Sequence, residues 1–187
     1  MESAADPEIK NLEEPLPGVP NDEKMMKLMV QIRMILALKY AKTDNQPSEV
    51  LENLYIGSVG AAMCKKNLKD LGITHILIVA DQLAPAFPEE FIYKQINILD
   101  SPDSNIIDTF TDAFQFIDQG RAQGKVLVHC FAGKSRSGTI CIGYVMKERN
   151  CSLLDAFRYV REKRDAVLPN TGFMNQLKRY ESVLNPN

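Results

Sequence analysis

The sequence of 187 residues contains no tryptophan, only two histidines and only four cysteines. The cysteines (Cys64, Cys130, Cys141 and Cys151) do not follow the spacing of zinc ligands, so we expect no metal and no cofactor. So few cysteines also argue against a secreted domain held by a disulfide framework, because such domains are rich in them. The chain is expected to keep free thiols in a reducing compartment.

The sequence also lacks a long uninterrupted apolar run. Its most apolar segment, MMKLMVQIRMILALKYA, is broken by Lys27, Gln31 and Arg33, which argues against a transmembrane helix. The N-terminal residues are acidic and contain prolines, whereas a signal peptide is basic and then apolar. We therefore expect a cytoplasmic or nuclear protein.

The formal net charge is only −2, which argues against nucleic acid as a partner, but the charges are unevenly placed. Residues 1–23 contain seven acidic residues, one lysine and four prolines, and are predicted to form a disordered acidic tail. Residues 24–43 contain five basic residues and no acidic one. We predict a basic amphipathic helix and a linker over 24–47, followed by a single folded domain over 48–187.

Beyond the linker, strand and helix patterns alternate. Runs typical of strands occupy residues 53–58, 74–80, 91–99 and 125–130. Helical patterns occupy residues 59–71, 105–124, 137–149, 152–164 and 172–184. Ser58 and Gly72 are suited to begin and end the first of these helices. The alternation predicts an α/β fold with a mainly parallel central sheet flanked by helices, and with an N-terminal helical extension.

The segment VLVHCFAGKSRSG places Cys130 at the end of a buried strand, shortly before a helix begins. A tight loop between a strand and a helix directs backbone N–H groups and the positive end of the helix dipole into one cavity, which suits a phosphate group. Such surroundings favour a thiolate, so Cys130 is predicted to be a nucleophile. Arg136 can donate two hydrogen bonds to phosphate oxygens, and Gly133 allows the sharp turn. A merely structural cysteine would not explain this order of residues.

The stretch HCFAGKSRS matches the His-Cys-x5-Arg-Ser signature of the cysteine-dependent protein tyrosine phosphatases. Over residues 48–184, which include NLYIGS, THILIVA and LPNTGFMNQL, the chain resembles the dual-specificity phosphatases, and among them the small plant-type members. The resemblance implies that Cys130 attacks the phosphorus, that the loop holds the phosphate oxygens and that no metal takes part. The loop residues are Phe131, Ala132, Gly133, Lys134, Ser135 and Arg136.

The resemblance also implies a general acid about thirty residues before the cysteine. Classical tyrosine phosphatases carry it in a Trp-Pro-Asp loop, which a chain without tryptophan cannot have. Asp100 stands at the expected place, and Asp103 is its competitor. By the same resemblance, Ser137 eases departure of the thiolate from a phosphocysteine intermediate, and His129 orients the loop. Asn170 resembles a residue that steadies the loop, but it could equally be a helix N-cap.

With about 140 residues in the catalytic domain, we expect a shallow pocket that accepts phosphotyrosine and phosphoserine or phosphothreonine in proteins. The family makes MAP kinases the expected substrates. Lys134 favours a phosphoinositide as an alternative, because lipid phosphatases of this superfamily typically carry two loop lysines, although Phe131 occupies the place of the second. An inactive module that binds phosphorylated proteins is a third interpretation. The presence of Cys130, Arg136 and Asp100 argues against it.

The segment 24–42 is basic, methionine-rich and apolar over much of its circumference, which is typical of helices that bind calmodulin. Met25, Met29, Ile32 and Leu38 fall at a recurrent anchor spacing. The same helix could instead pack on its own domain, pair with a second copy in a homodimer, or lie on a membrane surface.

Overall fold

The computed structural model describes residues 22–184, without the side chains of Asp22, Glu23, Met26 and Arg33. The predicted acidic tail, residues 1–23, lies almost entirely outside the described residues. The chain divides into two compact units, residues 1–36 and 37–187, and helix α1 (Asp22–Thr43) runs across the boundary between them. Within the described part, no helix is long and apolar enough to cross a membrane.

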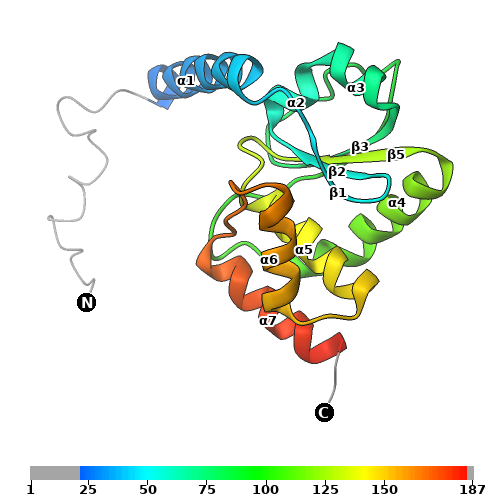
Figure 1. Cartoon of the computed structure of the whole chain (residues 1–187). Coiled ribbons are helices and arrows are strands. Elements are labelled where there is room, and N and C mark those ends of the chain that lie inside the picture. The colour runs from blue at the N-terminus through cyan, green and yellow to red at the C-terminus, as the bar shows by residue number, and fades with distance from the viewer. Residues whose placement is uncertain (1–21, 185–187) are drawn as a thin grey trace, which may run out of the picture. The chain divides into compact units, whose positions relative to one another are not determined.

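A five-stranded sheet forms the centre of the second unit, in the order β1-β2-β5-β3-β4 (Figure 1). The strands are β1 (Ser48–Leu51), β2 (Leu54–Gly57), β3 (Ile73–Val79), β4 (Ile92–Ile96) and β5 (Lys125–His129). The pairs β2–β5, β5–β3 and β3–β4 are parallel, and β1 runs antiparallel to β2. The prediction of an α/β fold with a mainly parallel sheet is confirmed.

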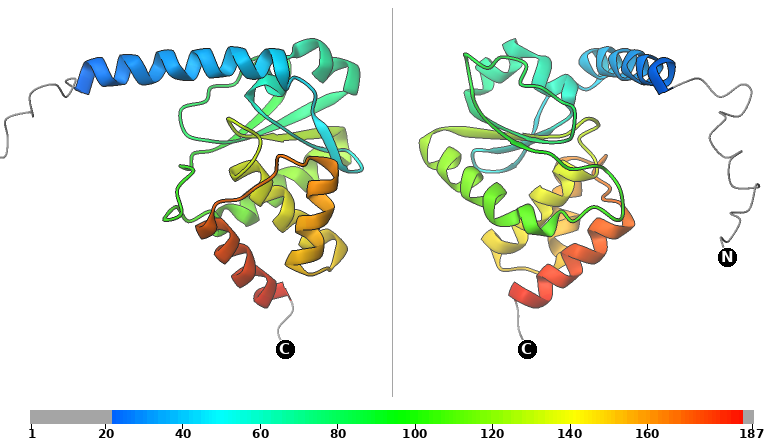
Figure 2. Two further views of the ribbon diagram at one scale, coloured as in Figure 1. Left: turned by 60° about the vertical axis from the view of Figure 1, so that its left-hand side comes forward. Right: turned by 180° about the vertical axis from the view of Figure 1, so that it is seen from behind.

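Helices cover both faces of the sheet because its central strands are apolar on both sides (Figures 1 and 2). One face carries α2 (Val59–Met63) and α3 (Lys65–Leu71), and the other carries α4 (Phe110–Gln123), α5 (Arg136–Arg149), α6 (Leu153–Lys163) and α7 (Thr171–Leu184), with the short 3-10 helix η2 (Ile107–Thr109) before α4. In β5, Val126 and Val128 belong to the larger core with α4 to α7, whereas Leu127 belongs to the smaller core with Leu68.

Helix α5 is buried over its first eleven residues, from Arg136 to Met146. Its glycines admit close neighbours, since a Cβ on Gly143 would lie 2.8 Å from the ring of Phe110. A helix that is largely apolar all round suits such a buried position. Because α5 begins directly after the cysteine loop, its packing fixes one end of that loop.

Two elements differ from the sequence prediction. The helix predicted over 59–71 is two helices that meet at Cys64, whose ψ of 78° is not helical. In one continuous helix Ala62 and Leu68 would point about 120° apart, and the break lets both face the smaller core. Strand β1 was not predicted, because it is short, follows Pro47 and buries only Val50 fully.

Candidate active site

The loop between strand β5 and helix α5, residues 130–135, carries the predicted nucleophile. Gly133 in this loop has a φ of 66°, in the left-handed region that favours glycine. A Cβ at this position would also lie 2.6 Å from the carbonyl oxygen of Gly57. A larger residue would therefore displace the loop.

Groups outside the loop bind the carbonyl oxygens of four consecutive loop residues. The donors are the N–H of Val59 to Phe131, the Arg164 side chain to Ala132 and Gly133, and the N–H of Leu168 to Lys134. The N–H and C=O of a trans peptide unit point in opposite directions, so the amides that follow these carbonyls turn to the inside of the loop. This is the arrangement expected of a cradle for a tetrahedral anion.

The sulfur of Cys130 faces the inside of the same loop. It accepts a hydrogen bond from the N–H of Gly133 (3.3 Å) and lies 3.2 Å from the hydroxyl oxygen of Ser137, in the first turn of α5. Both groups can donate a hydrogen bond to a negatively charged sulfur. The predicted nucleophile and the predicted cradle are therefore one structural unit.

The guanidinium of Arg136 is held by acidic groups at the carboxyl edge of the sheet. Its Nη1 donates to Asp81 Oδ1 (3.1 Å) and to the carbonyl oxygen of Ile98 (3.2 Å), and its Nε lies 3.7 Å from Asp100 Oδ2. Sequence reasoning missed Asp81. The signal was present, because Asp81 directly follows the apolar run 74–80 and so comes to the same edge as the cysteine loop.

Asp100 lies on the segment after β4 and contacts the cysteine loop. Its Oδ1 accepts hydrogen bonds from the hydroxyl of Ser135 (2.6 Å) and the side-chain amide of Asn170 (3.0 Å). The competitor Asp103 is exposed, and its backbone N–H bonds to the Ser101 hydroxyl in its own turn. Of these two carboxylates, the described contacts bring only Asp100 to the loop.

Asn170 makes contacts that fit both roles that the sequence left open. In addition to its bond to Asp100, its backbone N–H donates to the hydroxyl oxygen of Ser135 (3.2 Å). Its side-chain oxygen accepts from the N–H of Phe173 (2.9 Å), which is the geometry of an N-cap for α7. Asn170 therefore connects the start of α7 to the cysteine loop and to the carboxylate.

Two loop positions that bear on the substrate class differ in exposure. Lys134 is exposed, whereas Phe131 is half-buried. The ring of Phe131 packs edge-to-face against Tyr40 near the end of α1, with the centroids 5.8 Å apart. The loop position at which a second basic residue would favour a phosphoinositide therefore carries an aromatic ring that is paired with Tyr40.

His129, the last residue of β5, is buried and directly precedes the predicted nucleophile Cys130. Its Nδ1 lies 3.2 Å from the carbonyl oxygen of Cys130. Burial lowers the pKa of His129 to about 4, although the backbone contact opposes this shift. The ring is therefore neutral at pH 7, which suits an orienting role.

Acid is expected to destabilise the fold between about pH 6.5 and pH 4. The unfolded chain protonates His129 near 6.5, but the folded chain does so only near 4, so the free energy of unfolding falls as the pH falls through this window. The contribution of His129 is about 3 kcal/mol. Urea unfolding at pH 7.5 and pH 4.5 measures it. His75, whose pKa burial also lowers, contributes with the same sign. A His129→Asn variant that keeps the full wild-type difference would contradict the buried neutral ring.

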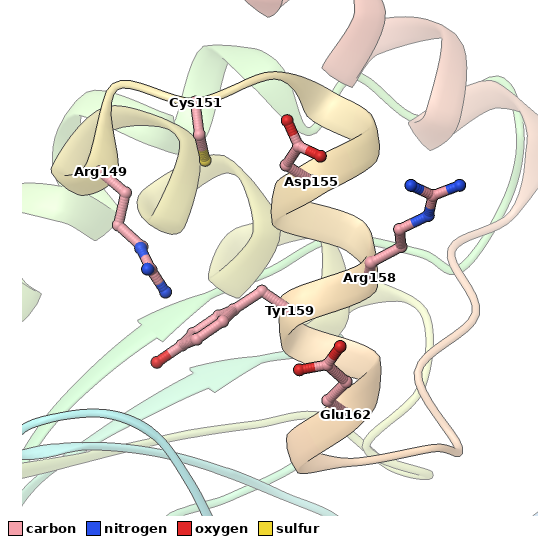
Figure 3. Close-up of a pocket in the computed structure, with 6 residues that line it drawn as sticks. All are labelled: Arg149, Cys151, Asp155, Arg158, Tyr159 and Glu162. Atoms are coloured by element: carbon pink, nitrogen blue, oxygen red, sulfur yellow. The ribbon is translucent and has the colours of Figure 1, made fainter.

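Buried Cys141 and half-buried Cys151 lack this environment. Burial raises the pKa of the Cys141 and Cys151 thiols above its ordinary value. Cys151 lies in a pocket of about 290 Å³ at α6, together with Arg149, Asp155, Arg158, Tyr159 and Glu162 (Figure 3). The guanidinium of Arg149 stacks on the Tyr159 ring, 4.2 Å from its centroid. Because two acids balance the two arginines, this pocket is a poor site for an anion.

Comparisons with known proteins agree with this geometry. The dual specificity phosphatase catalytic domain matches residues 54–183. The chain is 41% identical to dual specificity protein phosphatase 1 of Arabidopsis thaliana, over 90% of this chain and 87% of that one. It is 43% identical to MAP kinase phosphatase with leucine-rich repeats protein 1 of Dictyostelium discoideum, over 74% of this chain and 16% of that one.

Among solved structures, the human tyrosine phosphatase-like serine/threonine/tyrosine-interacting protein superposes with a TM-score of 0.72 at 37% identity, over 74% of this chain and 97% of that one. The family match covers the strand, the loop and the helices that build the site. The chain therefore belongs to the dual-specificity phosphatases, and is a protein tyrosine/serine/threonine phosphatase of the cysteine-dependent superfamily.

Proposed function

We propose that the chain hydrolyses phosphate monoesters on proteins through a phosphocysteine formed on Cys130. The sulfur attacks phosphorus with its electron pair, and the S–P bond forms as the bond from phosphorus to the substrate oxygen breaks. One observation carries the proposal: Arg136, which follows the Cys130 loop, lies 3.7 Å from the carboxylate of Asp100. The proposed nucleophile, the proposed phosphate-binding cation and the proposed acid thus lie around one loop.

Arg136 and the loop amides would hold the three non-bridging oxygens as charge moves from sulfur to the leaving oxygen. Asp81 and the carbonyl of Ile98 bind one nitrogen of this guanidinium, and so restrict its plane. The contribution of Asp81 would then be to orient Arg136 without touching the phosphate.

Asp100 would give its proton to the leaving oxygen and then take a proton from the water that attacks the phosphocysteine. Hydrogen bonds from Ser135 and Asn170 hold Oδ1, which supports Oδ2 as the atom that transfers the proton. In the second step the S–P bond breaks and the electron pair returns to sulfur. The hydroxyl of Ser137, 3.2 Å from the sulfur, would donate a hydrogen bond to it.

Phosphorylated MAP kinases are the substrates we propose. The support is the name of the Dictyostelium relative, a MAP kinase phosphatase. A phosphoinositide is the alternative, because exposed Lys134 could meet an additional phosphate. The aromatic pair of Phe131 and Tyr40 offers no second charge for it.

Phosphate release from a peptide with phosphothreonine and phosphotyrosine two residues apart tests the substrate class, with a metal chelator present throughout. Mass spectrometry is expected to show release from both residues. A soluble phosphatidylinositol phosphate serves as the competing substrate. Phosphate release from the lipid and not from the peptide would show that the substrate is a phosphoinositide. Release from neither would contradict the proposed function.

We also propose that calcium-loaded calmodulin binds helix α1. Large apolar side chains are exposed along it, namely Met25, Leu28, Met29, Val30, Ile32, Met34, Ile35, Leu36 and Leu38. They include two runs of three consecutive residues, so they cannot share one stripe of a helix. A groove that encloses the helix suits this distribution better than a flat membrane does, and calmodulin offers a methionine-rich groove of that kind.

Titration calorimetry of the full chain with calmodulin tests this partner. Binding is expected with calcium and not with chelator, and the variant Ile32→Glu with Leu36→Glu should abolish it. If the wild-type chain gives no binding heat with calmodulin and calcium, and elutes as a dimer, the partner of this helix is a second copy of the chain and not calmodulin.

A further inference from the structure

The end of helix α1 is built into the catalytic unit. The main-chain oxygen of Asp44, the residue after the helix, accepts a hydrogen bond from the Ser58 hydroxyl (3.0 Å). The backbone of Tyr40 packs on α2 so closely that a Cβ on Gly60 would lie 2.3 Å from the Tyr40 carbonyl. Asn45 accepts a further hydrogen bond from the side chain of Asn67. Residues 40–45 are therefore fixed to the same body as the cysteine loop.

Arg164, at the end of α6, joins this segment to the phosphate cradle. Its guanidinium binds both carboxylate oxygens of Asp44, at 3.0 and 2.6 Å. The same group donates from Nε to the carbonyl of Gly133 (2.9 Å) and from Nη2 to that of Ala132 (3.3 Å). Its side chain is only 8% exposed. One buried side chain thus contacts Asp44 on one side and the loop backbone on the other.

The carboxylate is what makes this position suitable for a cation. A buried guanidinium without a counter-ion is costly, and it would turn toward water or toward a bound anion. Burial opposes ionisation of Asp44, but hydrogen bonds from Arg164 prevail and hold the pKa of Asp44 below its ordinary value. Asp44 is therefore charged at neutral pH and keeps Arg164 directed at the loop carbonyls.

We infer that Asp44 is a positioning residue for the phosphate loop, acting through Arg164 on the carbonyls of Ala132 and Gly133. Turning either carbonyl would turn the amide that follows it, since the two lie in one rigid peptide plane. The hydrogen bonds that Asp44 accepts within the described residues come from Ser58 and Arg164 rather than from Cys130, and Asp44 lies outside residues 54–183, which match the catalytic domain family. The inference rests on the proposed function, in that the loop must bind a phosphate.

The test compares Asp44→Asn, Asp44→Glu and Arg164→Lys with the wild-type chain. We measure kcat and KM on para-nitrophenyl phosphate, the affinity for tungstate by calorimetry, and the melting temperature. Asp44→Asn is expected to lower kcat and tungstate affinity about tenfold each. Asp44→Glu, which keeps the charge, should recover most of both. Arg164→Lys should resemble Asp44→Asn, because one ammonium cannot bind a carboxylate bidentately and two carbonyls as well.

Glu148→Gln is the matched control, because it removes an ion pair with Arg121 (2.9 Å) at the far end of α5. Glu148→Gln should lower the melting temperature and leave kcat and tungstate affinity unchanged. Wild-type tungstate affinity in folded Asp44→Asn would overturn the inference. If Asp44→Asn does not fold, wild-type tungstate affinity in Arg164→Lys would overturn the inference. If the wild-type chain shows no turnover, the proposed function is wrong. If Asp44→Asn still binds tungstate more weakly than that chain, the inference on Asp44 holds nonetheless.

Discussion

Replacing Cys130 with serine is expected to lower kcat for an aryl phosphate by at least about 10⁴-fold. A serine hydroxyl is not ionised near neutral pH. Within residues 22–184, the side chain at this position has hydrogen-bond contacts to the Ser137 hydroxyl and the Gly133 N–H, neither of which is a base, so attack on phosphorus should become very slow. The exchange replaces one sulfur by one oxygen beside Gly133 and Ser137, so the fold should persist. Phosphate release in single-turnover mixing measures the loss directly.

Cys151→Ser is the control, since Cys151 lies in the separate pocket at α6. That variant should keep the wild-type kcat. Cys130→Ser should also retain tungstate binding within a few-fold, because Arg136 and the loop amides supply those hydrogen bonds. A Cys130→Ser chain that releases phosphate within tenfold of the wild-type rate would show that the sulfur is not the nucleophile.

Asp100→Asn is expected to lower kcat on phosphotyrosine and phosphothreonine peptides by about 10²–10⁴-fold. The amide oxygen can still accept from Ser135 and Asn170, so the local geometry should survive while the transferable proton is lost. The loss should be much smaller for para-nitrophenyl phosphate, because nitrophenolate leaves readily without a proton. This difference between substrates separates a missing acid from a damaged loop.

Asp103→Asn is the matched control for the acid, because it removes a carboxylate three residues away in the same segment. It should leave kcat unchanged on both kinds of substrate. The pH profile gives a second measurement, since the limb that reports the acid should be absent from Asp100→Asn. If Asp103→Asn lost activity on the peptides and Asp100→Asn did not, Asp103 and not Asp100 would be the general acid.

The cysteine loop could be predicted from the sequence because its parts are adjacent in the chain. A buried strand, a glycine and a helix start within a dozen residues define the cradle locally. The acid is different. Nothing near Asp100 distinguishes it from Asp103, and only the family resemblance placed it at the site. Its contacts to Ser135 and Asn170 span 35 and 70 residues of sequence, which no local pattern encodes.

The supporting residues were missed for the same reason. The bond from Arg136 to Asp81 spans 55 residues, and that from Arg164 to Asp44 spans 120. Each of these acids lies just after an element that was predicted correctly, a strand before Asp81 and a helix before Asp44. Sequence reasoning can place such a residue at an edge of the fold, but it cannot choose the partner.

Strand β5 has a consequence for how the chain acquires its structure. It lies between β2 and β3 in the sheet, yet it comes last of the five strands in the sequence. A chain synthesised only as far as residue 124 would hold β1 with β2 and β3 with β4 as two pairs, each with one apolar strand edge unpaired. Such edges invite association with other chains. The strand that leads directly into the proposed nucleophile Cys130 is thus also the one that completes the sheet, so we expect the fold and the catalytic activity to form together.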